Sequence, residues 1–135
     1  MNTIRLAGTD LEISEIGFGG IPIMALTMNE AVSIVKYCFD LGITFFDTAN
    51  MYLSSEEKIG TALEAVREKV VIATKTAQRD AREVAAHIAF SLQQLKTDWL
   101  DLYQLHTVSN QETLQQVLGP PGAFEAARRA REAGK

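Results

Sequence analysis

The sequence predicts an α/β fold of the (β/α)8 barrel type, limited to its first four strand–helix units after an N-terminal β-hairpin. Three observations lead to this prediction. Short apolar runs alternate with amphipathic helical patterns, as in βαβ units that form a parallel sheet. Each strand with its helix takes roughly 30 residues, the usual size of such a unit. Four units fit into 135 residues, whereas a complete barrel takes about 250, so we expect a half-barrel.

Composition and charge narrow the class of protein. Apolar residues make up 47% and charged residues 22% of the chain, which is typical of a globular domain. The net charge of −4 argues against a nucleic-acid partner, which needs a basic face. Cys38 is the single cysteine and suits a reducing compartment. No signal peptide and no membrane-length apolar run is apparent, so we expect a cytoplasmic protein without a membrane partner.

The first elements follow from local patterns. Residues 3–6 and 11–14 alternate in strand fashion around the turn sequence AGTD, which predicts a hairpin. The short apolar run EIGFGG then predicts the first strand of the repeat. Thr27 and Glu30 form a capping box before a helical pattern, and Gly42 is placed to end that helix.

Three further units repeat this theme. Residues 43–47 predict a strand, followed by a helix that Ser54 caps together with Glu57. Residues 69–75 predict the next strand, with Asp80 and Glu83 capping its helix. We expect the buried stripe of that helix to consist of Ala85, Ile88, Ala89, Leu92 and Leu95. Residues 99–106 predict the fourth strand, followed by a loop containing GPPG and a helix from about residue 123 to Gly134.

A doubly wound sheet would show the same alternation of strands and helices. Its dinucleotide-binding turn requires the pattern G-x-G-x-x-G at the start of the first helix. The stretch GFGGIP has Pro22 at the position of the last glycine, and its capped helix starts several residues too late. We therefore favour the barrel, in which these glycines allow a tight turn or a close approach of the backbone to a ligand.

Polar side chains stand at the predicted carboxyl ends of successive strands. Asp47 ends the second strand, with Tyr52 in the following loop, Lys75 ends the third and His106 ends the fourth. Singly, each has an ordinary structural interpretation: a loop-capping acid, a solvated lysine, a hydrogen-bonded histidine. In a parallel barrel, however, these ends share the face at which chemistry is done. We therefore expect the four side chains to meet in one pocket.

The four residue types together suit reduction of a carbonyl group. A phenol with a pKa of about 10 is a poor proton donor at neutral pH, and we expect a nearby Lys75 ammonium to lower the pKa of Tyr52. Asp47 would hold Lys75 charged, and His106 would place the substrate carbonyl against the phenol. The proton goes to oxygen while carbon gains a hydride, which a cofactor has to supply.

These motifs resemble one known family. GFGG, GITFFDTANMY followed by SEEKIGTAL, VVIATK and DLYQLH occur in this order, and together they resemble the aldo-keto reductases. The resemblance covers nearly the whole chain and implies a (β/α)8 barrel that reduces a small-molecule aldehyde or ketone with NADPH. It implies catalytic roles for Asp47, Tyr52, Lys75 and His106. It also implies that Gly20, Ile21 and Asp47 lie near the nicotinamide end of the cofactor, and it implies no metal.

The chain is short for this family, which holds the adenine and phosphates of its cofactor through later units. We therefore expect residues 1–135 to be the N-terminal half of an aldo-keto reductase domain whose C-terminal half is missing. Two alternatives remain open at this point. One is a half-barrel that associates with itself, since its strand edges would be unpaired. The other is a binding or regulatory scaffold without turnover.

Overall fold

The computed structural model describes residues 1–135 and contains a two-stranded and a four-stranded sheet. The small sheet is the predicted hairpin, β1 (Thr3–Arg5) antiparallel to β2 (Glu12–Ser14). The large sheet is parallel and follows chain order: β3 (Phe18–Gly19), β4 (Phe45–Asp47), β5 (Val71–Thr76) and β6 (Leu102–Leu105). Sequential parallel strands joined by helices are the arrangement of half of a (β/α)8 barrel.

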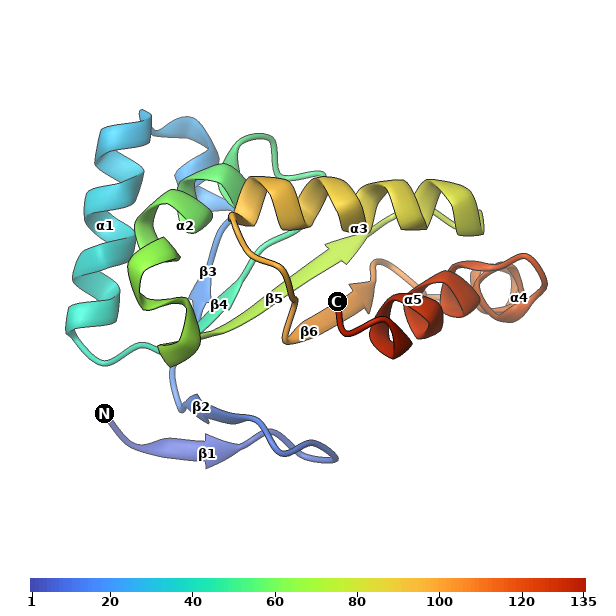
Figure 1. Cartoon of the computed structure of the whole chain (residues 1–135), viewed down its shortest axis with the longest axis horizontal. Coiled ribbons are helices and arrows are strands. Elements are labelled where there is room, and N and C mark those ends of the chain that lie inside the picture. Colours follow the sequence, from blue (N-terminus) through green and yellow to red (C-terminus); the bar gives the residue numbers. More distant parts are fainter.

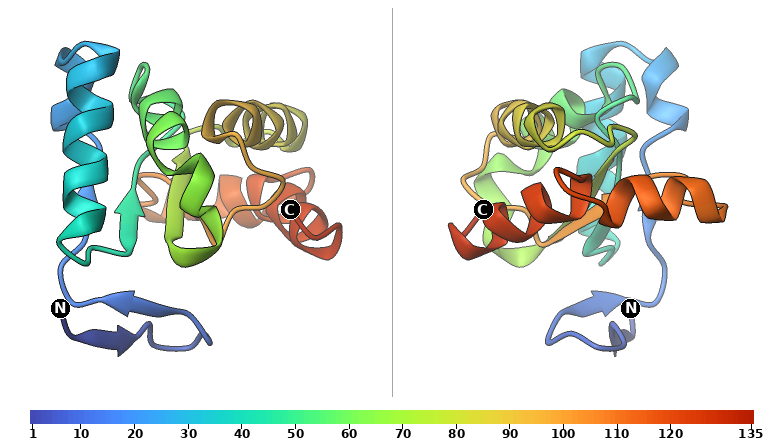
Figure 2. Two further views of the ribbon diagram at one scale, coloured as in Figure 1. Left: turned by 60° about the vertical axis from the view of Figure 1, so that its left-hand side comes forward. Right: turned by 90° about the vertical axis from the view of Figure 1, so that its right-hand side faces the viewer.

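The helices are α1 (Met28–Asp40), α2 (Ser55–Leu63), α3 (Ala81–Leu95), α4 (Gln111–Leu118) and α5 (Ala123–Glu132), with two 3-10 turns, η1 (Pro22–Ala25) and η2 (Glu64–Lys69). All helices except α4 cover one face of this sheet, and α4 lies beyond the end of the sheet against α5 (Figure 1). Neighbours α1, α2, α3 and α5 pack side by side around the sheet (Figure 2). No helix is both long enough and apolar enough to cross a bilayer.

The main core lies between the sheet and helices α1, α2 and α3. Phe46, Ile72, Ile59, Leu63 and Val35 are its large, completely buried members. Phe46 and Ile72 pair across β4 and β5, and both point toward the helices. Because side chains alternate along a strand, the residues on either side of them point to the opposite face, which α1, α2, α3 and α5 do not cover.

The hairpin lies at the amino ends of the barrel strands, opposite to the predicted site (Figure 1). It is attached by a reciprocal pair of hydrogen bonds: the N–H of Ser14 donates to Thr44 Oγ1, and the N–H of Thr44 donates to Ser14 Oγ, each over 3.0 Å. Ser14 is buried. The hairpin therefore closes one end of the half-barrel and leaves the carboxyl end open.

Several local predictions are confirmed. The capping box of Thr27 and Glu30 starts α1, and Gly42 follows this helix with a φ of 92°, a conformation that favours glycine. Asp80 caps α3 by accepting hydrogen bonds from two backbone N–H groups. Strands β4 and β6 are shorter than the apolar runs that predicted them.

Three local predictions are wrong. Ser54 makes no side-chain capping bond, because the start of α2 is tied to another loop through Ser55. The buried residues of α3 are Val84, Ile88, Ser91 and Leu95, while Ala85 and Ala89 are exposed. The loop before GPPG contains α4, whose start is a capping box of Asn110 and Thr113.

Candidate active site

The acid and the lysine predicted at neighbouring strand ends form an ion pair. Asp47 ends β4, and Lys75 lies near the end of β5 on the same face of the sheet. Lys75 Nζ donates to Asp47 Oδ2 over 2.6 Å and to the carbonyl oxygen of Thr48 over 2.7 Å. The side chain of Lys75 is only 12% exposed and that of Asp47 is 36% exposed. A half-buried ammonium needs such a paired carboxylate, which this arrangement supplies.

Tyr52 leans over this ion pair from the loop between β4 and α2. Two turn hydrogen bonds hold the loop: the N–H of Tyr52 donates to the carbonyl of Ala49, and the N–H of Ser55 donates to the carbonyl of Tyr52. Lys75 Nζ lies 5.2 Å from the centre of the Tyr52 ring. The phenol oxygen lies 3.3 Å from Nε2 of His106, and the two rings meet edge to face. The structure therefore brings all four predicted residues together.

The acidity of Tyr52 differs from the prediction. Burial, and secondly the negative charge of Asp47, raise the pKa of Tyr52 above 10. The predicted lowering by Lys75 does not appear, because the lysine charge is compensated by the carboxylate in contact with it. In this state Tyr52 keeps its proton at neutral pH.

Backbone pairing and two side chains that the sequence did not suggest hold His106 in place. The N–H of His106 donates to the carbonyl of Thr76 over 2.8 Å and so prolongs the pairing of β6 with β5. Arg79 donates to the carbonyl of His106 over 2.6 Å, and Thr107 Oγ1 is hydrogen-bonded to Nδ1 of the imidazole. A hydrogen bond from a side chain to the carbonyl of another loop leaves no pattern in the sequence. Nothing in the sequence therefore indicated that Arg79 holds His106.

The segment that begins with Gly19 and Gly20 at the end of β3, called the glycine loop below, lies next to the end of β4. The N–H of Gly20 donates to the carbonyl of Asp47 over 2.8 Å, and Ser55 Oγ donates to the carbonyl of Gly20 over 2.9 Å. A Cβ on Gly20 would lie 2.5 Å from Ser55 Oγ, so this close approach requires glycine. The N–H of Gly20 is thus engaged within the protein, whereas Ile21 is 52% exposed.

A buried lysine fastens the same loop. Lys58 on α2 is 3% exposed, and its Nζ donates to the carbonyls of Ile23, Met24 and Leu26 over 2.9, 3.1 and 2.7 Å. A buried ammonium is stable only where its donors are satisfied, and here three carbonyls satisfy them. Helix α2 therefore holds the glycine loop through Ser55 and Lys58 and also follows the Tyr52 loop directly.

Two groups at the carboxyl end of the sheet have no contact with other protein atoms. A Cβ on Gly19 would meet no atom within 4 Å, and one carboxylate oxygen of Asp47 has no hydrogen-bond partner in the protein. Lys75 is paired with Asp47, whereas Arg79 donates only to carbonyl oxygens, so no carboxylate compensates its positive charge.

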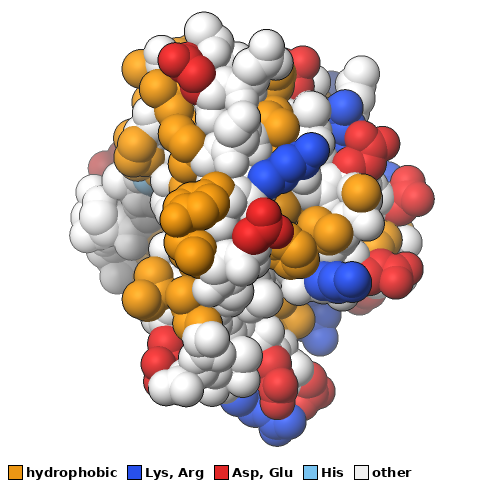
Figure 3. Space-filling view, turned by 90° about the vertical axis from the view of Figure 1, so that its left-hand side faces the viewer, with side chains coloured by type: hydrophobic (Ala, Val, Ile, Leu, Met, Phe, Trp, Pro, Cys, Tyr) orange, Lys and Arg blue, Asp and Glu red, His pale blue; other side chains and the backbone are white.

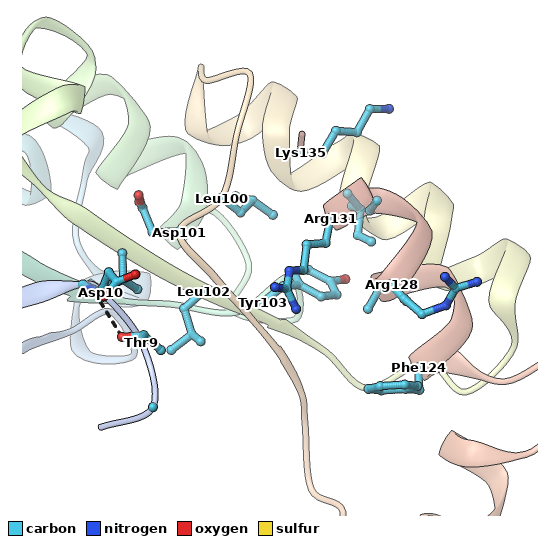
Figure 4. A pocket seen from close by; sticks show the side chains of 15 residues that line it. Thr9, Asp10, Leu100, Asp101, Leu102, Tyr103, Phe124, Arg128, Arg131 and Lys135 are labelled. Carbon is cyan, nitrogen blue, oxygen red and sulfur yellow. Dashed lines mark hydrogen bonds between the residues drawn. The ribbon is translucent and has the colours of Figure 1, made fainter. Parts of the chain in front are cut away.

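The four candidate residues coincide with no metal-ligand cluster and do not border the largest cleft of the chain. No group of three or more histidine, cysteine, aspartate or glutamate side chains comes together in a way that could hold a metal ion. The largest cleft, of about 570 Å³, lies along β6 between the hairpin tip and α5. Leu102, Tyr103, Phe124 and Arg131 border it (Figure 4), and none of the four candidate residues does.

Comparison with known proteins identifies the family of the chain. The sequence profile of the aldo/keto reductase family matches residues 15–133. A parallel sheet in chain order with helices on one face is the architecture of half of a (β/α)8 barrel. The chain belongs to the aldo/keto reductase family.

Individual relatives have similar folds and sequences. The uncharacterized oxidoreductase YqkF of Bacillus subtilis is 33% identical over 132 residues, which cover 87% of this chain and 43% of that protein. A putative aldo-keto reductase from Pseudomonas aeruginosa superposes with a TM-score of 0.86 at 26% identity, covering 98% of this chain and 55% of that structure. The holo form of an aldo-keto reductase from Bacillus halodurans gives a TM-score of 0.75 at 29% identity, with 91% and 48% covered.

These comparisons confirm the predicted fold class, because the similar structures are (β/α)8 barrels and the chain corresponds to about half of each. The chain spans less than half the length of the first curated relative.

Proposed function

We propose that the chain carries the catalytic half of an NADPH-dependent oxidoreductase that reduces an aldehyde or ketone to an alcohol, with Tyr52 as proton donor. The observation that carries the proposal is the position of the Tyr52 hydroxyl, 3.3 Å from His106 Nε2 and beside the ion pair of Lys75 and Asp47. Membership of the aldo/keto reductase family supports the reaction class.

Each of the four residues has its own role in the proposed reaction. Tyr52 donates its proton to the carbonyl oxygen, and the ammonium of Lys75 balances the charge of Asp47, which would otherwise disfavour the phenolate until solvent returns a proton. Asp47 holds Lys75 in place, and His106 orients the carbonyl oxygen by a hydrogen bond. The carbonyl carbon gains its hydride from the reduced nicotinamide, which is the chemistry that the bound cofactor supplies.

We further propose that Asp47, Ile21 and the backbone around Gly20 hold the nicotinamide end of NADPH. The open space at Gly19 and the unpaired carboxylate oxygen of Asp47 support this placement. Since the N–H of Gly20 is engaged by Asp47, Gly20 contributes by shape and not as a donor.

More polypeptide is expected to complete this site, either a C-terminal half of the same protein or a second copy. Strands β3 and β6 each have one unpaired edge. Helix α1 and the residue that follows it expose Ile34, Tyr37 and Leu41, and apolar side chains form a stripe over this face (Figure 3). An exposed apolar stripe of this kind is typical of a surface that another element covers.

The first test is a titration of the 135-residue chain with NADPH, followed by the fluorescence of the cofactor. Saturable binding means that the chain, alone or as a self-associated pair, holds the cofactor. Absence of binding by the folded chain assigns the cofactor site to a longer polypeptide, on which the turnover assay is then done.

Turnover tests the role of Tyr52. Carbonyl-dependent oxidation of NADPH is measured for the wild type and for Tyr52→Phe, with Tyr103→Phe as a matched control because the buried hydroxyl of Tyr103 has no hydrogen-bond partner. Loss of a general acid lowers kcat by about 10²–10⁴-fold, and Tyr103→Phe should leave it unchanged. Equal kcat values for the wild type and Tyr52→Phe, or no carbonyl-dependent oxidation, would contradict the proposal.

A further inference from the structure

Thr107 has an unusual backbone conformation next to the site. Its φ is 58°, in the left-handed region that β-branched residues rarely adopt. Such a conformation persists only where its surroundings hold it, and it is found most often at functional sites. Thr107 directly follows His106, so the contacts that hold this conformation can also affect the histidine of the candidate site.

Arg79 holds the backbone on both sides of the strained residue. Its Nη2 donates to the carbonyl of His106 over 2.6 Å and to the carbonyl of Thr107 over 3.4 Å. The N–H of His106 is bonded to Thr76 at the end of β5. The segment from 106 to 107 is therefore anchored to the β5–α3 connection as well as to the sheet.

The strained backbone brings the hydroxyl of Thr107 back onto the preceding side chain. Thr107 Oγ1 is hydrogen-bonded to Nδ1 of His106, while Nε2 of the same ring lies 3.3 Å from the phenol oxygen of Tyr52. Each imidazole nitrogen thus has one protein partner, and both partners are hydroxyl groups that can donate or accept.

Two arrangements of the protons fit these contacts, and they differ in whether the proton of Tyr52 can reach a substrate. In the first, Thr107 donates to Nδ1 and the N–H at Nε2 donates to the phenol oxygen until a substrate carbonyl takes over that hydrogen bond. The phenol proton is then free for the substrate. In the second, Nδ1 donates to Thr107 and the phenol proton is bound to Nε2, where it cannot reach a substrate. The tautomer of His106 is set by the bond at its other nitrogen.

We propose that Thr107 is a positioning residue that holds His106 as the tautomer with its proton on Nε2, so that the proton of Tyr52 stays free for the substrate oxygen. The catalytic use of this tautomer rests on the proposed function, whereas the presence of the tautomer does not depend on it. The hydroxyl of Thr107 has no other hydrogen-bond partner within the protein. A donor to Nδ1 has to be an O–H or N–H group, and Thr107 is the residue whose backbone is strained in placing one there.

The test is ¹⁵N nuclear magnetic resonance of the imidazole nitrogens, since the chemical shifts of the two nitrogens distinguish the tautomers. The chain has only two histidines, and His87, whose Nδ1 is bonded to Thr76 Oγ1 over 2.8 Å, serves as an internal reference. We expect the proton of wild-type His106 on Nε2 at a pH where the ring is neutral. The measurement needs neither cofactor nor turnover.

Three variants separate the hydroxyl from the backbone. Thr107→Ser keeps the hydroxyl and should keep the tautomer. Thr107→Val keeps the β-branched shape without the hydroxyl and should shift the proton of His106 toward Nδ1. Thr107→Gly removes both the hydroxyl and the conformational strain and should behave like the valine variant. His87 should be unchanged in all three.

The tautomers measured in the wild type and in the three variants decide whether Thr107 has this role. A wild-type proton on Nδ1, or a valine or glycine variant with the wild-type tautomer, would overturn it. In an active protein we also expect Thr107→Val to lower kcat on the order of 10-fold with little change in the KM for NADPH, and Thr107→Ser to restore it. If Tyr52→Phe leaves turnover unchanged, the proposed function fails, whereas the tautomer measurement still decides the role of Thr107.

Discussion

Lys75 Nζ lies 2.6 Å from Asp47 Oδ2, although the two residues are not opposite each other in the sheet. Asp47 pairs with Ala73, so Lys75 stands two residues further along β5 and on the same face. Its side chain returns toward β4 and crosses beneath the ring of Tyr52. The ion pair therefore determines the electrostatic surroundings of the phenol.

We predict that Asp47→Asn lowers the pKa of Tyr52. The carboxylate is one of the two causes that raise this pKa, and its loss also leaves the charge of Lys75 uncompensated, which acts in the same direction. The measurement is a pH titration of tyrosine absorbance, with Tyr52→Phe identifying the Tyr52 component. Asp40→Asn, on the exposed end of α1, should change nothing, and an unchanged or higher pKa in Asp47→Asn would refute the prediction.

Replacement of the buried lysine should loosen the glycine loop. Lys58→Met leaves three carbonyls between Ile23 and Leu26 without their donor, and hydrogen bonds to charged groups contribute about 1.5–3 kcal/mol each. We expect unfolding in urea to become easier by about 3 kcal/mol and amide exchange in the loop to accelerate. The control is Lys36→Met on the exposed side of α1; equal stabilities of the two variants would show that the Lys58 contacts contribute nothing.

Glu56 should make stability depend on pH above the ordinary range of a carboxyl group. It is 2% exposed, accepts a hydrogen bond from Thr74 Oγ1 over 2.6 Å, and burial raises its pKa above 4.5. The folded state then binds the proton more tightly than the unfolded state, so stability falls as the pH rises from about 4.5 through the folded pKa.

Glu56→Gln removes this titration and keeps an acceptor for Thr74. The stability of Glu56→Gln relative to the wild type should therefore increase with pH in that window, as measured by urea unfolding at several pH values. Glu57→Gln, at the exposed neighbour, serves as the control. A constant difference between Glu56→Gln and the wild type across the window would contradict the prediction.

Acid should weaken the last helix through Glu125. Hydrogen bonds from Arg128 and Arg129, over 2.9 and 2.8 Å, lower the pKa of Glu125 to about 2. A lowered folded pKa means that the stabilisation is complete above about 4.5 and is lost as the pH falls toward 2. Amide exchange along α5 should increase over that interval in the wild type and not in Glu125→Gln. Glu112→Gln on α4 should behave like the wild type.

Much of the fold could be predicted because each unit carries local signals. The capping box at Thr27, the glycine at 42 and the acid at 80 depend on neighbouring residues, and all three are confirmed. The helix α4 was missed although Asn110 and Thr113 form a box of the same kind, because threonine in place of glutamate makes the pattern less specific.

The buried face of α3 could not be predicted from the spacing of apolar residues alone. Both Val84 and Ala85 fit a 3.6-residue period, and the position of α5 decides that Val84 is buried. The four candidate residues were found because parallel strands bring their carboxyl ends together. Arg79 and Thr107 were not found, because their role depends on a backbone angle and on carbonyls that belong to other loops.

The order of the sheet also bears on how the chain is made. Strands β3, β4, β5 and β6 pair strictly in the order of the sequence, so each strand meets its partner as soon as its own unit has left the ribosome. At synthesis rates of about 5–20 residues per second, a unit of roughly 30 residues emerges within a few seconds. The nascent polypeptide can therefore fold unit by unit, with the edge of its newest strand as the growing point of the sheet.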